Sequence, residues 1–182
     1  RSIEKIAFKE NTYVVGVFQK YYLDLEKYSN HIVLVEPGNM GNVGTIIRTA
    51  DAAGCTGIIL MKNTVDVFAG KTVRAAMGSL FHLPVVSDVS LDELKGFLDK
   101  QNIVLQATAL DSEAKKYFDV DFTKPTAIVF GNEGDGISKE LLSAAEQKIY
   151  IPMIGQTESL NVSTAAAVVL YEAARQRMFY KQ

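Results

Sequence analysis

Short apolar runs alternate with amphipathic stretches along most of the chain, and this alternation predicts the secondary structure. Apolar runs of strand length fall at 32–35, 58–61, 84–86, 103–107, 127–130 and 149–151. Helical patterns cover 43–53, 71–80, 91–98, 137–145 and 161–178. Ser90 precedes one of these stretches with Glu93 three residues on, a capping-box pattern. Alternating strands and helices predict a mostly parallel α/β sheet flanked by helices on both faces.

The first thirty residues follow a different pattern. Residues 13–18 form a strand-like run, and 19–30 are polar and aromatic like a linker. We therefore expect residues 1–30 to be an N-terminal appendage or the remnant of a preceding domain, and residues 31–182 to form the main domain.

Composition excludes several classes of protein. The 182 residues are 48% hydrophobic and 22% charged, which is globular rather than disordered. One cysteine excludes a disulfide framework, and two histidines without cysteine partners argue against a zinc site, so we expect no metal. No apolar run approaches the roughly 18 residues of a membrane span, and no signal-peptide pattern is present, so we expect a soluble, cytoplasmic protein. With a formal net charge of -2, any nucleic acid must be held by a local basic patch.

The first glycine-rich cluster, at 36–54, follows the first predicted strand. Gly38, Gly41 and Gly44 are spaced G-x-x-G-x-x-G, which differs from the G-x-G-x-x-G of dinucleotide-binding proteins, so NAD is not expected. Arg48 in the following helix is either a surface arginine or a guanidinium aimed at phosphate or a reacting oxygen. Asn42 is either a plain helix N-cap or a functional amide.

Two further clusters follow later strands. Gly131, Gly134 and Gly136 flank Glu133, which indicates either close backbone approach to a ligand or a simple turn with Ser138 as N-cap. The segment 151–164 ends a strand at a proline and opens a helix with serine and asparagine side chains, which bind polar groups or merely cap the helix. In parallel sheets, such turns gather at the carboxyl ends of the strands, where ligands bind.

Together and in this order, the clusters resemble the three motifs of the SpoU/TrmH family of RNA ribose 2′-O-methyltransferases, in the SPOUT superfamily. The first motif is matched by Asn42, Gly44 and Arg48, and the second by Gly131, Glu133, Gly134 and Gly136. The third is matched by Ile-Pro-Met at 151–153 and Ser-Leu-Asn-Val-Ser at 159–163. The stretch 71–78 is similar to another family segment. The resemblance extends from about His31 to Met178.

The resemblance implies a C-terminal trefoil knot, a homodimer and S-adenosylmethionine as cofactor. It implies transfer of a methyl group to a ribose 2′-hydroxyl, with rRNA as the expected substrate and tRNA as the alternative; DNA lacks that hydroxyl. The rivals are a knotted RNA- or cofactor-binding protein without turnover and a base-modifying SPOUT enzyme.

The resemblance also assigns residues to roles. The catalytic set is Arg48, Asn42, Glu133 and Asn161, with Glu133 expected to orient Arg48 through a bidentate pair. The cofactor set is Thr108, Ala109, Leu110, Gly131, Asn132, Gly134, Ile151, Met153, Ser159, Leu160 and Asn161. RNA phosphates are assigned to Arg48, Arg74 and Lys71, with Lys62 as a further candidate.

Overall fold

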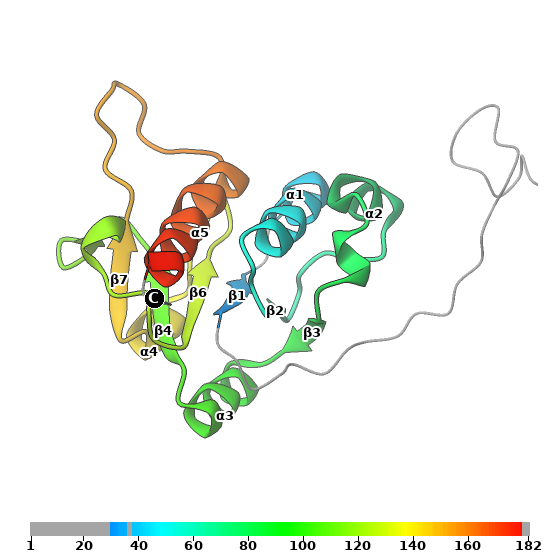
Figure 1. Ribbon diagram of the computed structural model, residues 1–182, viewed down its shortest axis with the longest axis horizontal. Helices are drawn as coiled ribbons and strands as arrows, with labels where there is room; N and C mark the ends of the chain where they lie inside the picture. Colours follow the sequence, from blue (N-terminus) through cyan, green and yellow to red (C-terminus); the bar gives the residue numbers. More distant parts are fainter. Residues whose placement is uncertain (1–29, 36–37, 180–182) are drawn as a thin grey trace, which may run out of the picture.

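A computed structural model of the 182-residue chain describes residues 30–35 and 38–179 (Figure 1). Its centre is a seven-stranded sheet in the order β3-β2-β1-β6-β4-β7-β5, in which every paired strand is parallel. The strands are β1 (Asn30–Leu34), β2 (Gly57–Met61), β3 (Val85–Val89), β4 (Val104–Thr108), β5 (Lys115–Lys116), β6 (Thr126–Phe130) and β7 (Gln147–Tyr150). The predicted parallel α/β architecture is confirmed.

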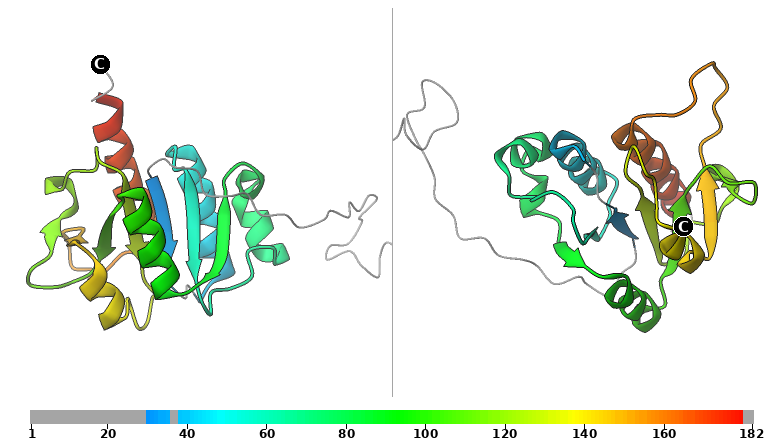
Figure 2. Two further views of the ribbon diagram at one scale, coloured as in Figure 1. Left: turned by 90° about the horizontal axis from the view of Figure 1, so that it is seen from below. Right: turned by 180° about the vertical axis from the view of Figure 1, so that it is seen from behind.

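Helices cover both faces of this sheet (Figures 1 and 2). One face carries α1 (Met40–Ala52), α2 (Gly70–Ala76) and α5 (Val162–Phe179), and the other carries α3 (Leu91–Gln101) and α4 (Lys139–Ala144). Two short 3-10 helices, η1 (Ser79–Phe81) and η2 (Tyr117–Asp119), complete the order.

The central strands divide their side chains between two apolar layers. Ile32 and Leu34 of β1 pack in the layer under α1, α2 and α5, while Val33 packs with Leu94 of α3 in the other layer. Every residue of β1, β2 and β6 is buried. Burial on both faces is why these strands appear in the sequence as continuous apolar runs rather than as alternating ones.

Glycine 44 sets how closely α1 and α2 pack. A Cβ at Gly44 would lie 2.5 Å from the Thr72 carbonyl oxygen and 2.6 Å from the Ala75 Cβ. The two helices therefore touch backbone to backbone at this point, and the glycine of the first motif has a packing role in α1.

Several boundaries differ from the sequence prediction. The helix expected over 71–80 ends at Ala76, because Met77 and Gly78 both take left-handed backbone conformations (φ 51° and 96°) before η1 begins. The strand expected at 84–86 runs to Val89. The edge strand β5, formed by two exposed lysines, has no apolar signal in the sequence.

The capping box of Ser90 and Glu93 at the start of α3 is confirmed, as is Ser138 as the N-cap of α4.

Two other sequence predictions, the N-terminal appendage and the trefoil knot, are not tested by the described structure. The strand-like run 13–18 and most of the 1–30 appendage lie outside the described residues, although Asn30 is the first residue of β1. The trefoil knot stays a prediction. Among the described helices, none combines the length and the apolar character needed to cross a membrane.

Candidate active site at the carboxyl edge of the sheet

All three sequence clusters follow the carboxyl ends of strands that lie near one another in the sheet. The first follows β1, the second follows β6, and the third follows β7, with β4 between β6 and β7. Parallel strands end on one side of a sheet, so residues far apart in sequence meet there.

A chain of side-chain hydrogen bonds joins the three clusters. Asn42 Nδ2 donates to Glu133 Oε1 (2.5 Å), and Asn161 Nδ2 donates to Asn42 Oδ1 (3.4 Å). Asn161 Oδ1 in turn accepts from the Ser163 amide (2.9 Å) and hydroxyl (2.6 Å). The amide of Asn42 is thus held at both ends, by a carboxylate of the second cluster and an amide of the third.

The interpretation of Asn42 as the helix N-cap is wrong. α1 begins three residues earlier than the sequence pattern suggested, and Asn39 caps it by accepting from the Gly41 amide (2.8 Å). Asn42 lies within the first turn of the helix, which leaves its amide free to point toward Glu133.

The glycines of the second cluster shape its loop. Asn132 and Gly136 exchange two backbone hydrogen bonds of 3.0 Å each, and Gly136 has φ 70°. A Cβ at Gly131 would lie 2.5 Å from the Gly136 carbonyl carbon. The Asn132 side chain accepts from the Gly134 amide (2.7 Å). The turn therefore needs glycine at 131 for close backbone packing, and it presents Glu133 on its exposed side.

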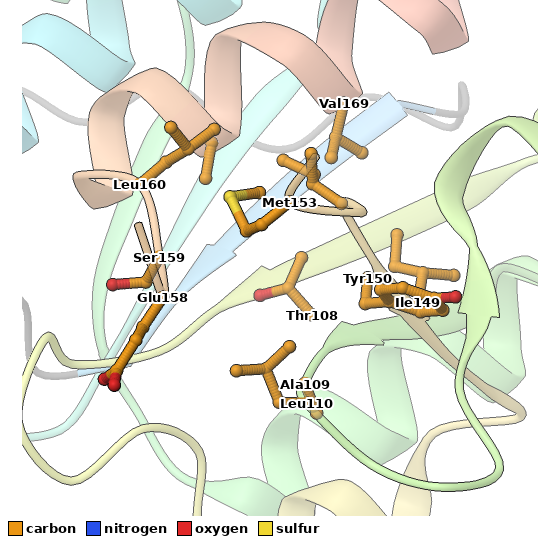
Figure 3. A pocket seen from close by; sticks show the side chains of 12 residues that line it. Thr108, Ala109, Leu110, Ile149, Tyr150, Met153, Glu158, Ser159, Leu160 and Val169 are labelled. Atoms are coloured by element: carbon orange, nitrogen blue, oxygen red, sulfur yellow. The ribbon is translucent and has the colours of Figure 1, made fainter. Parts of the chain in front are cut away.

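A pocket of about 190 Å³ opens beside this network, between the ends of β4 and β7 and the start of α5 (Figure 3). In Figure 3, Met153, Leu160 and Val169 lie on one side, Ala109 and Leu110 lie across from them, and Thr108 lies between. Its lining includes Thr108, Ala109, Leu110, Ile151, Met153, Ser159 and Leu160, all predicted for the cofactor.

Four predicted cofactor residues do not line this pocket: Gly131, Asn132, Gly134 and Asn161. The first three build the β6–α4 turn, and Asn161 points its amide to Asn42 instead. The lining also includes residues that the sequence prediction omitted, namely Ile149, Tyr150, Glu158, Ala165 and Val169. Val169 falls within the helical pattern over 161–178, which predicts a helix but carries no signal for a ligand wall.

An ion pair joins the two segments that contribute Leu110 and Ile149 to the pocket. Lys148 Nζ lies 2.7 Å from Asp111 Oδ2, so the segment that follows β4 is tied to β7 next to Leu110 and Ile149. The hydrogen bond from Lys148 lowers the pKa of the Asp111 carboxyl, and the same bond raises the pKa of Lys148. The pair therefore stays charged at neutral pH.

The structure does not bring Arg48 to Glu133. Arg48 is exposed on α1, and within the described part of the chain it has no ion-pair partner. It lies six residues beyond Asn42, which is about 9 Å along the helix and about 240° around it. The expected bidentate pair between Glu133 and Arg48 is absent among the described residues, where Glu133 Oε1 instead accepts from Asn42.

The predicted phosphate-binding cations lie on and near α2. An ideal Cβ at Gly41 would be 3.7 Å from Lys71 Cε, so the lysine stem lies over the start of α1. An ideal Cβ at Gly70 would be 3.3 Å from Arg74 Nη1, so that guanidinium folds back toward the same edge. Lys62 follows β2, and its backbone amide donates to the Val89 carbonyl of β3 (3.1 Å).

Fold and site together define a parallel α/β protein with a polar network and an apolar pocket at the carboxyl edge of its sheet. The model of the SpoU rRNA Methylase family matches residues 29–171. The chain belongs to this family.

Known relatives share this region. The chain is 43% identical over 134 residues to the 23S rRNA (guanosine(2553)-2′-O)-methyltransferase of Bacillus subtilis, covering 72% of this chain and 52% of that protein. It is 41% identical over 140 residues to the tRNA (guanosine(18)-2′-O)-methyltransferase of Escherichia coli, covering 75% of this chain and 58% of that protein. The chain thus spans little more than half the length of these relatives.

A solved structure agrees with the fold. The SpoU methyltransferase AviRb from Streptomyces viridochromogenes, in complex with the cofactor AdoMet, superimposes with a TM-score of 0.76 at 39% identity. The match covers 82% of this chain and 60% of that one.

Proposed function

We propose that this chain transfers a methyl group from S-adenosylmethionine to a ribose 2′-hydroxyl of RNA. The observation that carries the proposal is the hydrogen-bond chain from Glu133 through Asn42 to Asn161, which lies beside the pocket. Relatives named as rRNA and tRNA 2′-O-methyltransferases support it. We take rRNA as the substrate and tRNA as the alternative.

The residues of the pocket fit S-adenosylmethionine. Leu110 and Leu160 offer apolar surface for a purine ring, and Glu158 and Ser159 bring oxygen atoms to one side. Leu110 is 78% exposed and Leu160 is 36% exposed, which is expected of apolar side chains that a ligand covers. The cofactor, when bound, supplies an electrophilic methyl group on sulfur.

The network orients the polar groups that the ribose would meet. Asn42 and Asn161 are held in one arrangement by Glu133 and Ser163, so their orientation is set before the substrate arrives. Glu133 acts as a positioning residue in this scheme, because its carboxylate holds Asn42. The site then needs a cation to bind phosphate and stabilise negative charge on the attacking oxygen, and we assign that role to Arg48.

The position of Arg48 supports a homodimer. Arg48 lies about 9 Å farther along α1 than Asn42 and on another side of the helix, and it forms no ion pair with the network of its own chain among the described residues. In a dimer built on α1 and α5, Arg48 would approach the site of the partner subunit. Tyr171 of α5 is 55% exposed and offers apolar surface for such a contact.

The proposal assigns residues 31–182 to the methyltransferase domain and places the protein in the cytoplasm with its RNA substrate. The 2′-hydroxyl requirement excludes DNA as a substrate.

The test uses RNA and a labelled cofactor. The protein is incubated with S-adenosyl-[methyl-³H]methionine and either ribosomal RNA or tRNA from cells that lack the corresponding gene, and the RNA is digested to nucleosides. We expect label in 2′-O-methyl nucleosides, in rRNA. Label in a base would favour a base-modifying enzyme. Tight cofactor binding without transfer to either RNA would favour a binding protein without turnover.

A further inference from the structure

The outer face of α2 carries two cations, and two exposed apolar side chains follow the end of the helix. Lys71 and Arg74 are three residues apart and both exposed, so they share one side of α2, and Met77, the C-cap residue of the helix, is exposed as well. Phe81 of η1 follows four residues later and is 55% exposed, while Met77 is 71% exposed. We define these four residues as the α2 strip.

The backbone conformation at Met77 and the contacts of η1 hold the apolar end of the strip in one place. Met77 has φ 51°, a conformation that a bulky L-residue rarely adopts. Strained conformations of this kind persist only where the surrounding structure holds them. Here the Met77 amide donates to the Arg74 carbonyl, and His82 Nδ1 lies 3.1 Å from Asp51 Oδ2, which ties the end of η1 to α1.

The cationic end of the strip lies at the candidate active site. Lys71 Cε lies over Gly41 at the start of α1, and the Arg74 guanidinium folds back over Gly70. From Gly70 to Met77 the helix rises about 10 Å, which is the length of about three stacked nucleotides at roughly 3.4 Å each. The strip therefore extends from the site along α2 by the length of a short stretch of RNA.

Charge and chemistry favour RNA over a protein as the occupant. Protein interfaces are depleted of lysine at their centres, whereas single-stranded RNA is held by cations along its backbone and by aromatic side chains on which bases stack. Asp51 Oδ2 lies 3.1 Å from Nδ1 of His82, the residue that follows Phe81, so this carboxylate already has a hydrogen-bond partner. The formal net charge of -2 requires a local cationic surface of this kind.

We propose that the RNA segment flanking the target nucleotide runs along the α2 strip, with its phosphates on Lys71 and Arg74 and an unpaired base stacked on Phe81 beside Met77. This rests on the proposed function, because it concerns how the same site receives its RNA. It predicts that a single-stranded flank contributes to binding through its bases as well as through its charge.

The test separates stacking from charge. Binding is measured by fluorescence anisotropy on the full chain, with a fluorescein-labelled single-stranded RNA of about 15 nucleotides and with an abasic ribose-phosphate strand of the same length. Phe81→Ala should weaken binding of the RNA by about 5- to 100-fold and leave the abasic strand unchanged, while Phe81→Trp should restore it. Lys71→Gln should weaken both strands and reduce the salt slope by about 0.7.

Matched controls lie elsewhere on the molecule. Phe118→Ala removes another exposed phenylalanine, on η2 at the β5 edge of the sheet, and Lys95→Gln removes an exposed lysine from α3 on the opposite face. Both should leave RNA affinity unchanged. Circular dichroism confirms that each variant is folded.

Three outcomes would overturn the proposal. Phe81→Ala could leave RNA binding intact, or weaken both strands equally, which would remove stacking as the cause. It could also convert a dimer to a monomer in sedimentation velocity, which would assign Phe81 to a subunit interface. Methyl transfer by the wild-type protein is measured separately. If methyl transfer fails but RNA binding still depends on the bases, the proposed activity is wrong and the RNA-binding role of the α2 strip is retained.

Discussion

Asn42 and Glu133 are 91 residues apart in the sequence, yet the amide nitrogen of one donates a hydrogen bond to the carboxylate of the other. The contact exists because β1 and β6 are neighbours in the sheet, paired from Asn30↔Thr126 to Leu34↔Phe130. The segments that follow these two strands therefore emerge side by side. The same bond orients the Asn42 oxygen to accept from Asn161.

Asn42→Asp tests this network. A second carboxylate facing Glu133 replaces a donor by an acceptor of like charge, so both groups should move apart. We expect methyl transfer to fall by at least ~10-fold, with little loss of stability because the contact is exposed. Single-turnover rates and thermal unfolding measure the two effects. Thr49→Ala, about two turns farther along α1, is the control. Equal losses of methyl transfer in both variants would remove the network from the mechanism.

Arg48 offers a test between a catalytic and a structural arginine. Arg48→Ala should change the free energy of unfolding by well under ~1 kcal/mol, because the side chain is exposed, and should leave cofactor affinity intact. Arg48→Lys keeps the charge but loses the planar fork, and we expect it to lose at least ~10²-fold in turnover. Near-normal methylation by the lysine variant would reduce Arg48 to a diffuse positive charge.

The pocket should bind S-adenosylmethionine and S-adenosylhomocysteine but not NAD. Leu160→Ala removes apolar surface from the wall, which should weaken S-adenosylhomocysteine by about 10-fold, as expected for part of one buried aliphatic side chain. Ile154→Ala is the control, since Ile154 is 99% exposed and absent from the lining. Isothermal titration calorimetry gives both affinities. Absence of heat with folded wild-type protein would remove the methyltransferase proposal.

Two helical glycines should respond to alanine in opposite directions. Gly44→Ala places a Cβ 2.5 Å from the Thr72 carbonyl oxygen, so we expect a loss of about 1–3 kcal/mol from overpacking between α1 and α2. Gly96→Ala in α3 meets nothing within 4 Å, so it should stabilise the protein by about 0.5–1 kcal/mol through helix propensity. Urea unfolding of the two variants gives both values. Equal changes in the free energy of unfolding for the two variants would show that α1 and α2 can move apart to accommodate the added Cβ at little cost.

His31 should make stability depend on pH. Burial, with a smaller contribution from Arg177, lowers the pKa of His31 from 6.5 to about 4. The folded state therefore keeps the ring neutral while the unfolded state takes up a proton below pH 6.5, so stability falls as the pH drops from about 6.5 to about 4 and then levels off. The slope from this group approaches about 1.4 kcal/mol per pH unit.

The measurement compares wild type with His31→Leu. Urea unfolding at pH values between 4 and 7 should show a shallower decline for the variant, whatever its stability at neutral pH. Parallel curves would mean that the buried ring takes up its proton without cost. The 1% exposure of His31, and the absence of a hydrogen bond to either ring nitrogen among the described residues, are the basis for expecting a difference.

The sequence by itself determined the layers of the fold. Continuous apolar runs such as 127–130 predict strands buried on both faces, and amphipathic stretches such as 91–98 predict the covering helices. Both can be predicted because the buried face of a strand or helix sets the spacing of apolar residues in the local sequence. Seven of the twelve residues that line the pocket are among those that the family resemblance assigned to the cofactor. Left-handed breaks such as Met77 carry no such signal, because methionine is an ordinary helix former.

Only the tertiary structure decided which of these residues meet. In the structure Glu133 accepts a hydrogen bond from Asn42 and does not pair with Arg48. Gly131 packs against Gly136 in the turn and does not line the pocket. These choices depend on strand order and on the direction of side chains around α1, which are set by packing between segments about 90 residues apart. Local periodicity shows which face of a helix or strand is buried, but it does not show which other element covers that face. The network therefore depends on the pairing of β1 with β6, which only the tertiary structure shows.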